Sequence, residues 1–263
     1  GRKDRRALTS QAFTVPLPGG RDPDWSALEG PEIEVLEATR HYRKLQRGAL
    51  RGNRFCLRVR DLVGDASVIA QRLARIGAAG VPNYFGPQRF GHGNANLAAA
   101  AELLRGGSLA DRFARGMAIS AARALLFNAV LAERVSAGTW DRVLCGDVMQ
   151  LDGRRAQFRA ESADADTEAR VRALAIHPTG PLPGRAGRAL EPGPTVRHLE
   201  EAVLARHGDW VEGLARLGVE AERRALRLPV RALRWALSGD ALELELELPA
   251  GGFATTVLRE CVA

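Results

Sequence analysis

The chain has 263 residues, a formal net charge of +7 and a hydrophobic fraction of 46%, which is the composition of an ordinary globular protein. This balance excludes an intrinsically disordered chain, and no apolar run approaches the ~18 residues that a transmembrane helix requires. The first residues, GRKDRRALTS, also lack the apolar core of a signal peptide. We therefore expect a cytoplasmic protein of one large or two small domains.

The positive charge is concentrated in one short segment. Residues 40–60 contain eight cationic side chains and no acidic one. Such a local field attracts polyanions, and the planar guanidinium group of arginine matches phosphate oxygens. A solvated charged edge is the alternative interpretation. If the segment binds RNA, we expect contacts to the RNA backbone from Arg43, Lys44, Arg47 and Arg51.

The cysteines and histidines are scattered along the chain, without a CxxC or HExxH pattern. Cys56 falls in an alternating strand pattern, Cys145 stands alone, and Cys261 lies near a C-terminal apolar stretch. We therefore predict free, buried thiols in a reducing cytoplasm, with no disulfide and no metal site.

The first part of the chain is predicted to contain several strands. Residues 7–16 are expected to form one that ends in a Pro/Gly turn, and 32–35 alternate apolar with acidic side chains. A single helical turn is expected between them at 25–28. The clearest strand is 55–59, where apolar residues occupy every second position and indicate a half-buried face.

A helix is predicted to follow this strand. Asp65 has the position of its N-cap, and Gly77 and Gly80 are expected to end it. A Gly- and Asn-rich loop over 83–96 comes next. The apolar face of the helix is expected to consist of Val68, Ile69, Leu73 and Ile76.

The middle of the chain is predicted to be mainly helical. A hairpin at 148–158 interrupts it, because two short apolar runs flank an Asp-Gly turn. The Pro- and Gly-rich stretch 178–194 is the strongest candidate for a linker, and Thr195 is expected to cap the next helix. The predicted helices are 97–104, 120–135, 167–174, 195–207 and 220–226.

The end of the chain returns to strand. Leucines at every second position of 242–248 alternate with glutamates, and this strict period of two outweighs the helix propensity of both residue types. Gly251, Gly252 and Phe253 are expected to open a final short helix. Strands at both ends with helices between them indicate an α+β fold in which a helical insertion interrupts one sheet.

Four segments contain residue types suited to catalysis or ligand binding. Residues 1–6 surround the carboxylate of Asp4 with four cations, which would keep it ionised and able to act as a nucleophile or base. Segments 50–55, 81–91 and 249–255 each combine glycine with an aromatic residue. A frayed charged terminus, aromatic side chains that fill the core and plain turns are the alternative interpretations.

Six segments of the sequence, taken together, resemble one protein family. They are GRKDRRALTSQ, RKLQRGALRGNRF, GVPNYFGPQRFG, ISAARALLFNAVLAERV, GDVMQL and LELPAGGFATTVLRE. In this order they are similar to the tRNA pseudouridine synthase D family. The resemblance implies the catalytic sheet of a pseudouridine synthase, mixed or antiparallel, interrupted by a largely helical insertion domain. It places the insertion at 79–227 and the catalytic domain at 1–78 and 228–263.

The resemblance also implies roles for individual residues. Asp4 matches the catalytic aspartate of the GxKD motif, and Asn53 matches the asparagine of the GN-x-F motif that lies beside it. Phe253 matches the aromatic of the PxGxFAT motif that contacts the target base. Phe55 is expected to support the site or pack against the base, and residues 83–91 are expected to be structural and to form a hinge.

The implied reaction is the isomerisation of uridine 13 of tRNA to pseudouridine, without cofactor or metal. We expect tRNA as the partner, no membrane contact and a monomer. Whether Asp4 attacks C1′, attacks C6 or removes a ribose proton stays open. Family members normally have a further segment before the GxKD motif, so a catalytically impaired RNA-binding fragment is the second hypothesis. A hydrolase that pairs Asp4 with Asp22 is the third.

Overall fold

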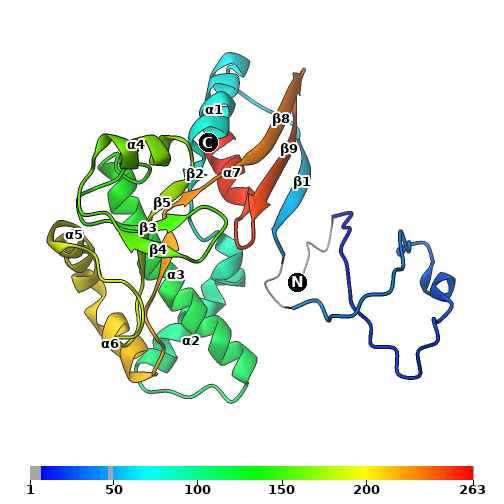
Figure 1. Ribbon diagram of the computed structural model, residues 1–263, viewed down its shortest axis with the longest axis horizontal. Helices are drawn as coiled ribbons and strands as arrows, with labels where there is room; N and C mark the ends of the chain where they lie inside the picture. Colours follow the sequence, from blue (N-terminus) through cyan, green and yellow to red (C-terminus); the bar gives the residue numbers. More distant parts are fainter. Residues whose placement is uncertain (1–6, 47–49, 263) are drawn as a thin grey trace. The chain divides into compact units, whose positions relative to one another are not determined.

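The computed structural model describes residues 7–46 and 50–262, coloured along the sequence in Figure 1. Residues 1–51 and 52–263 form two separate compact units. Among the described residues, all of the long helices and paired strands belong to the second unit. Helices and antiparallel sheets occur there together, so the α+β prediction is confirmed.

The first unit has little regular structure in its described residues. Its short 3₁₀ turn, η1 (Trp25–Leu28), begins after Asp24, whose carboxylate accepts a hydrogen bond from the Ser26 N–H at 3.1 Å. The predicted helical turn is therefore confirmed. The strands predicted at 7–16 and 32–35 are wrong, because their described backbone groups form only the isolated bridge between Gly30 and Ile33. Alternation alone does not make a strand without a neighbouring strand to pair with.

The second unit contains three sheets and the helices that cover them. The strands are β1 (Gly52–Val59), β2 (Val81–Pro82), β3 (Val148–Leu151), β4 (Gln157–Arg159), β5 (Ile176–Leu182), β6 (Glu222–Ala225), β7 (Arg227–Leu228), β8 (Arg231–Ser238) and β9 (Ala241–Pro249). The helices are α1 (Ala66–Ala79), α2 (Ala95–Leu104), α3 (Arg112–Ser136), α4 (Ala165–Arg172), α5 (Pro194–Leu204), α6 (Gly208–Arg216) and α7 (Ala254–Val262). Short 3₁₀ turns are η2 (Pro87–Arg89), η3 (His92–Asn94) and η4 (Ala205–His207).

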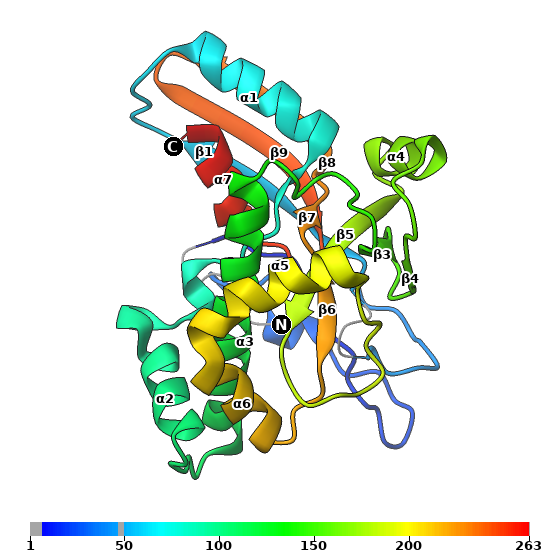
Figure 2. The ribbon, with the colours of Figure 1, turned by 90° about the vertical axis from the view of Figure 1, so that its left-hand side faces the viewer.

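The antiparallel sheet β1-β9-β8 joins the two predicted end strands, with β9 in its centre. Asn53 lies opposite Leu248, and Phe55 lies opposite Leu246. One face of this sheet packs against α1 and α7, and Figure 2 shows α1 lying along it. Asp65 caps α1 as predicted, but Val68 is 42% exposed and does not belong to its buried face. The buried side chains of this core are Ile69, Leu73, Ile76, Val81, Leu228, Val230, Leu242, Leu244, Leu246, Leu248, Val257 and Cys261.

The sheet β4-β3-β5-β6 forms a second centre of the fold, beside the long helix α3. Phe127, Val130 and Leu131 of α3 are fully buried. Of the described helices, α3 alone has the length and apolar composition of a membrane-crossing helix, and 44% of its most apolar window is buried inside the protein. A soluble core helix passes the same test, so this finding is weak support for a membrane span.

The short pair β2–β7 joins the two ends of the segment predicted to be an insertion. Val81 lies opposite Leu228, so residues next to the boundaries of 79–227 are hydrogen-bonded neighbours. The domain boundaries themselves stay a prediction.

Several predicted elements of the middle region are confirmed with shifted ends. The hairpin of β3 and β4 forms as expected, and α2, α4, α5 and α7 overlap their predicted ranges. Helix α3 begins at Arg112, because the Asp111 carboxylate accepts hydrogen bonds from the N–H groups of Phe113 and Ala114. Thr195 is not the cap of α5, since Gly193 occupies that position and Pro194 follows in the first turn.

The predicted linker at 178–194 is wrong at its start, because β5 lies in the centre of its sheet. Proline has no N–H to donate, but the Pro178 carbonyl still accepts a hydrogen bond from the Leu226 N–H at 2.8 Å. The helix predicted at 220–226 is also wrong, since β6 pairs with β5 there. Pairing between strands that are distant in the sequence has overridden the local helix propensity of this segment. Helix α6 and strand β8 were not predicted from the sequence.

Two of the three predicted buried thiols are exposed. Cys261 is buried, whereas Cys56 and Cys145 are exposed. Cys56 lies on the outward face of β1, where the alternation places every second side chain in solvent.

Candidate functional site

The predicted site residues fall into three groups. Asp4 and Arg47 lie outside the described residues. Arg43, Lys44 and Arg51 are exposed side chains of the first unit, and none belongs to a helix or strand. The second unit holds the remaining candidates, Asn53, Phe55 and Phe253.

Asn53 stands at the beginning of β1, where this strand meets the end of β9. Its neighbour Gly52 lies so close to β9 that a Cβ atom there would be 2.5 Å from the Leu248 carbonyl oxygen. Only glycine permits this approach of the two backbones, as the sequence indicated. Phe55 follows on the same, inward face and packs against the core of the sheet.

Phe253 lies just beyond the end of β9, between the 249–252 turn and α7. The turn is closed by a hydrogen bond from the Gly252 N–H to the Pro249 carbonyl oxygen at 3.0 Å. A Cβ atom on Gly252 would lie 3.2 Å from the Leu248 Cβ atom and 2.8 Å from Leu228 Cδ1. Asn53 and Phe253 therefore both lie at one end of the β1–β9 ladder, because Leu248 neighbours Asn53 in the sheet and packs beside the turn.

The ring of Phe253 is packed against the aromatic segment 83–91. The centroids of the Phe85 and Phe253 rings are 6.2 Å apart in an edge-to-face arrangement. The Asn128 side chain holds the backbone of Phe85. It accepts a hydrogen bond from the Phe85 N–H at 2.9 Å and donates one to the Phe85 carbonyl oxygen at 3.1 Å. Its ring also meets the buried ring of Phe127 at 5.5 Å. Phe253 is partly buried, so part of its ring can meet a flat ligand.

Arg224 of β6 links this aromatic segment to the 249–252 turn. Its Nη2 atom donates to the Asn83 side-chain oxygen at 2.7 Å and to the Gly251 carbonyl oxygen at 3.1 Å. The guanidinium carbon lies 4.2 Å from the centroid of the Phe85 ring. Burial, followed by the nearby charge of Arg89, lowers the pKa of Arg224 to about 10, so this side chain remains cationic at neutral pH.

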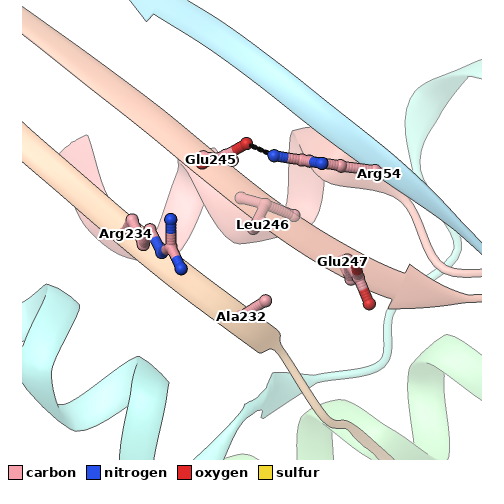
Figure 3. Close-up of a pocket in the computed structure, with 6 residues that line it drawn as sticks. All are labelled: Arg54, Ala232, Arg234, Glu245, Leu246 and Glu247. Atoms are coloured by element: carbon pink, nitrogen blue, oxygen red, sulfur yellow. Dashed lines mark hydrogen bonds and ion pairs between the residues drawn. The ribbon is translucent and has the colours of Figure 1, made fainter.

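Hollows in the described part of this unit include a larger and a smaller one. The larger, about 510 Å³, adjoins the aromatic segment and the first turn of α7, and it includes Tyr84, Phe85, Phe90, Asn128, Thr255 and Arg259. The smaller, about 150 Å³, lies on the outer face of the three-stranded sheet, where Figure 3 shows Arg54 paired with Glu245. Within the described part of the chain, no group of three or more His, Cys, Asp or Glu side chains could hold a metal ion.

Sequence reasoning identified Asn53 and Phe253 but missed Arg224. The available signal was the neighbouring pair of arginines at 223 and 224, before a segment in which Leu226 and Leu228 flank Arg227. That segment was predicted to be a helix, so neither its strand nor its approach to the 249–252 turn was expected. Asn83 and Phe85 belong to the segment 81–91, which combines glycine with aromatic residues. In the structure, Asn83 accepts a hydrogen bond from Arg224, and the Phe85 ring meets the ring of Phe253.

Comparisons with known proteins agree with the arrangement. A family model described as tRNA pseudouridine synthase D matches residues 1–110 and 108–261. Proteins named tRNA pseudouridine synthase D from Nitrosococcus oceani and Methylococcus capsulatus are each 50% identical to this chain, over 267 and 264 residues. Each alignment covers 100% of this chain and 74% of the relative.

A solved structure is similar in fold. It is a crystal structure described as tRNA pseudouridine synthase D from Methanosarcina mazei, and the superposition has a TM-score of 0.64. The superposition covers 87% of this chain and 72% of that one. Because the sequence identity is 19%, the similarity shows only that the two folds are alike. The fold predicted from the sequence motifs is thereby confirmed.

Proposed function

This chain belongs to the tRNA pseudouridine synthase D family, and we propose that it isomerises uridine 13 of tRNA to pseudouridine with Asp4 as nucleophile or base. The observation that carries the proposal is the family match over residues 1–110 and 108–261. The relatives at 50% identity have the same name, which supports tRNA as the substrate. The assignment of Asp4 and of uridine 13 rests on the resemblance of the GRKD segment to the family's catalytic motif.

The reaction is balanced without any added reagent. The bond between uracil N1 and ribose C1′ breaks, the base rotates, and a bond between C5 and C1′ forms. N1 gains a proton and C5 loses one to solvent. The Asp4 carboxylate would assist by attack at C1′, by attack at C6 or by removal of a ribose proton, and all three routes give the same product. The proposed reaction therefore uses no cofactor and no metal.

Access to the base requires extrusion from the folded tRNA, which costs a few kcal/mol. Stacking of the extruded uracil on the ring of Phe253 would offset this cost, because base–aromatic stacking contributes about 1–3 kcal/mol. Asn53 would hold a substrate oxygen in register, with Phe55 behind it in the core. The position of Asn53 and Phe253 at one end of the β1–β9 ladder supports this division of roles.

The remaining parts of the proposal concern binding and organisation. Arg43, Lys44, Arg47 and Arg51 would contact RNA phosphates, and residues 79–227 would form the insertion domain. The pairing of Val81 with Leu228 supports that boundary. We further propose that the protein acts as a monomer in the cytoplasm, where its tRNA substrate is found.

Release of tritium from tRNA labelled at uridine C5 tests the activity directly, because C5 loses its hydrogen only when the new bond forms. The chain should release tritium, and Asp4→Asn should release none above background while still binding tRNA. Asp22→Asn is the matched control, since Asp22 is an exposed aspartate of the same unit whose described partner is Arg40.

Release that persists in Asp4→Asn would remove Asp4 from the mechanism. Loss in Asp22→Asn would favour the pairing of two carboxylates. If the unaltered chain binds tRNA but releases no tritium, it is a catalytically impaired RNA-binding member of the family and the proposed activity is wrong.

A further inference from the structure

Two separate paths connect Arg224 to Phe253. The first runs through the backbone, because Arg224 Nη2 donates to the carbonyl oxygen of Gly251, two residues before Phe253. The second runs through aromatic rings, because the guanidinium group covers the Phe85 ring at 4.2 Å and Phe85 meets Phe253 at 6.2 Å. A displacement of Arg224 would therefore release both the turn that bears Phe253 and the ring that supports it.

The 249–252 turn needs support from outside itself. Gly251 has a φ of +85°, and Gly252 follows directly, so two adjacent residues have the conformational freedom of glycine. Among the described residues, the turn has one internal backbone hydrogen bond, from the Gly252 N–H to the Pro249 carbonyl oxygen. A hydrogen bond from a buried guanidinium group selects one of the conformations that two glycines allow.

The contacts of this side chain require arginine. Its Nη2 atom serves the Asn83 side-chain oxygen and the Gly251 carbonyl while the flat face lies on Phe85. A lysine ammonium is a compact point charge, which cannot serve two acceptors in this geometry and cover a ring at the same time. Asn83 is held in turn, because its side-chain nitrogen donates to the Ala225 carbonyl oxygen at 2.8 Å.

We propose that Arg224 is a positioning residue of the pseudouridylation reaction, which fixes the orientation of Phe253 and thereby the alignment of the extruded uracil. This inference rests on the proposed function. It assigns Arg224 to the chemical step and not to the capture of tRNA, because its hydrogen bonds go to protein groups of the aromatic segment and the turn. Phosphate contacts are expected from other arginines.

The test compares Arg224→Lys with Arg123→Lys. Arg123 is the control, because its Nη2 atom also serves more than one acceptor: the backbone carbonyls of Leu182 and Glu220, each at 3.1 Å, and the Glu222 carboxylate at 3.2 Å. Both arginines also have a buried Nε without a hydrogen-bond partner among the described residues. Within the described part of the chain, the hydrogen bonds of Arg123 reach neither the 249–252 turn nor the aromatic segment.

The measurements are tritium release under single-turnover conditions and the dissociation constant for tRNA. Arg224→Lys should slow the single-turnover rate by about 10- to 100-fold, since misplacement of a reacting group by about 1 Å can cost a factor of 10². Its tRNA affinity should stay within about twofold of the unaltered protein. Arg123→Lys should retain both values. A wild-type rate in folded Arg224→Lys would overturn the proposal.

A double-mutant cycle with Phe253→Leu shows whether the effect passes through Phe253. Once the ring is absent, addition of Arg224→Lys should slow the reaction by less than about twofold, because the residue has nothing left to position. Independent, multiplicative losses would contradict a positioning role.

Hydrogen–deuterium exchange of residues 250–256 separates this proposal from the proposed function. Exchange should become faster in Arg224→Lys and stay unchanged in Arg123→Lys, whether or not the chain is active. If the unaltered chain releases no tritium, the proposed activity fails, yet faster exchange still supports the hold of Arg224 on the turn. Unchanged exchange in Arg224→Lys would overturn the positioning role in either case.

Discussion

Two neighbouring arginines of β6 contribute to two different regions of the molecule. The first region is the interior of the four-stranded sheet, and the second is the surroundings of the 249–252 turn and Phe253. Arg223 turns into the interior of the four-stranded sheet and pairs with Glu200, and their side chains are only 4% and 8% exposed. Arg224 turns toward the 249–252 turn, where it contacts an amide oxygen, a backbone carbonyl and aromatic rings. Both guanidinium groups are desolvated, but among the described residues only the first has a carboxylate at ion-pair distance.

This difference separates stabilisation from positioning. In a buried pair such as Arg223 and Glu200, the electric fields of the two opposite charges largely cancel. The pair therefore belongs to the packed interior and does not attract charged groups from solvent. Beside Phe253, no carboxylate of the described residues pairs with Arg224, so its positive potential acts on the aromatic segment. Substitutions in the two regions should therefore affect different measurements.

The largest effect on stability is expected from Arg134→Met in the first region. Arg134 and Asp147 are 1% and 0% exposed and share two hydrogen bonds, of 2.9 and 3.0 Å. Removal of the cation leaves a buried, unpaired carboxylate, which should lower the free energy of unfolding by about 3–5 kcal/mol. Guanidinium chloride unfolding measures this loss.

The matched control is Arg159→Met, at an ion pair with Glu161 on the surface. It should cost no more than about 1 kcal/mol, because solvent screens an exposed pair. At a temperature where both variants are folded, each should retain the single-turnover rate. A slowed rate in Arg134→Met would show that the two regions are coupled.

Gly52→Ala should affect the second region. The new Cβ atom would meet the Leu248 carbonyl oxygen at 2.5 Å, so β1 has to move at the residue before Asn53. We expect a loss of about 1–3 kcal/mol in stability, as in other overpacked sites, together with slower tritium release. Thermal unfolding and the single-turnover assay check the two parts.

Gly116→Ala is the control for this substitution, since a Cβ atom on Gly116 of α3 would meet nothing within 4 Å. It should stabilise the protein by roughly 0.5–1 kcal/mol, because alanine has the higher helix propensity. Full activity in Gly52→Ala would mean that the reaction tolerates displacement at Asn53.

A smaller, pH-dependent effect is expected from His177 in the first region. Burial lowers the pKa of His177, while the hydrogen bond to Asp152 opposes this shift and the charges of Arg227 and Arg231 add to it. The unfolded chain, with a histidine pKa of about 6.5, then binds more protons than the folded one. Stability should therefore fall as pH drops below about 6.5 toward the lowered pKa of the folded state.

Urea unfolding at pH 7.5 and 5.5 compares the unaltered protein with His177→Gln. The unaltered protein should lose more stability between the two values, because glutamine does not titrate. Equal losses in both proteins would show that His177 is not the group responsible.

The smallest effect is expected from Arg54→Gln on the outer face of the three-stranded sheet. Arg54 forms an ion pair with Glu245 (Figure 3), and its hydrogen bond holds the pKa of that carboxyl below its usual value. Carboxyl titration by NMR should show the Glu245 pKa returning toward normal, with no measurable change in melting temperature. A clear fall in melting temperature would contradict this, and weaker tRNA binding would assign the face to the substrate.

Local patterns predicted the parts of the fold that are governed by local physics. The alternation at 242–248 and 55–59 indicated β9 and β1, because a two-residue period is incompatible with one buried face of a helix. Asp65 indicated the start of α1, because its side chain accepts from the Ser67 N–H within the same turn. Strands β5 and β6 could not be found this way, since their prolines and helix-forming residues become strands only through pairing with each other.

For the candidate site, too, the sequence indicated some residues and not others. The resemblance of two short segments to family motifs indicated Asn53 and Phe253. Arg224 could not be found, because its acceptors lie 141 and 27 residues away, at Asn83 and Gly251. Contacts over such separations follow from the pairing of β2 with β7 and of β5 with β6, which no local pattern specifies.

Mapping of pseudouridine in tRNA incubated with this chain is the most direct test of the proposed activity at uridine 13. A carbodiimide adduct on pseudouridine stops reverse transcription one nucleotide before the modified base, and thus reports both product and position. We expect a new stop corresponding to position 13 with the unaltered chain, and no such stop with Asp4→Asn. A stop at another position, or one that persists in Asp4→Asn, would contradict it.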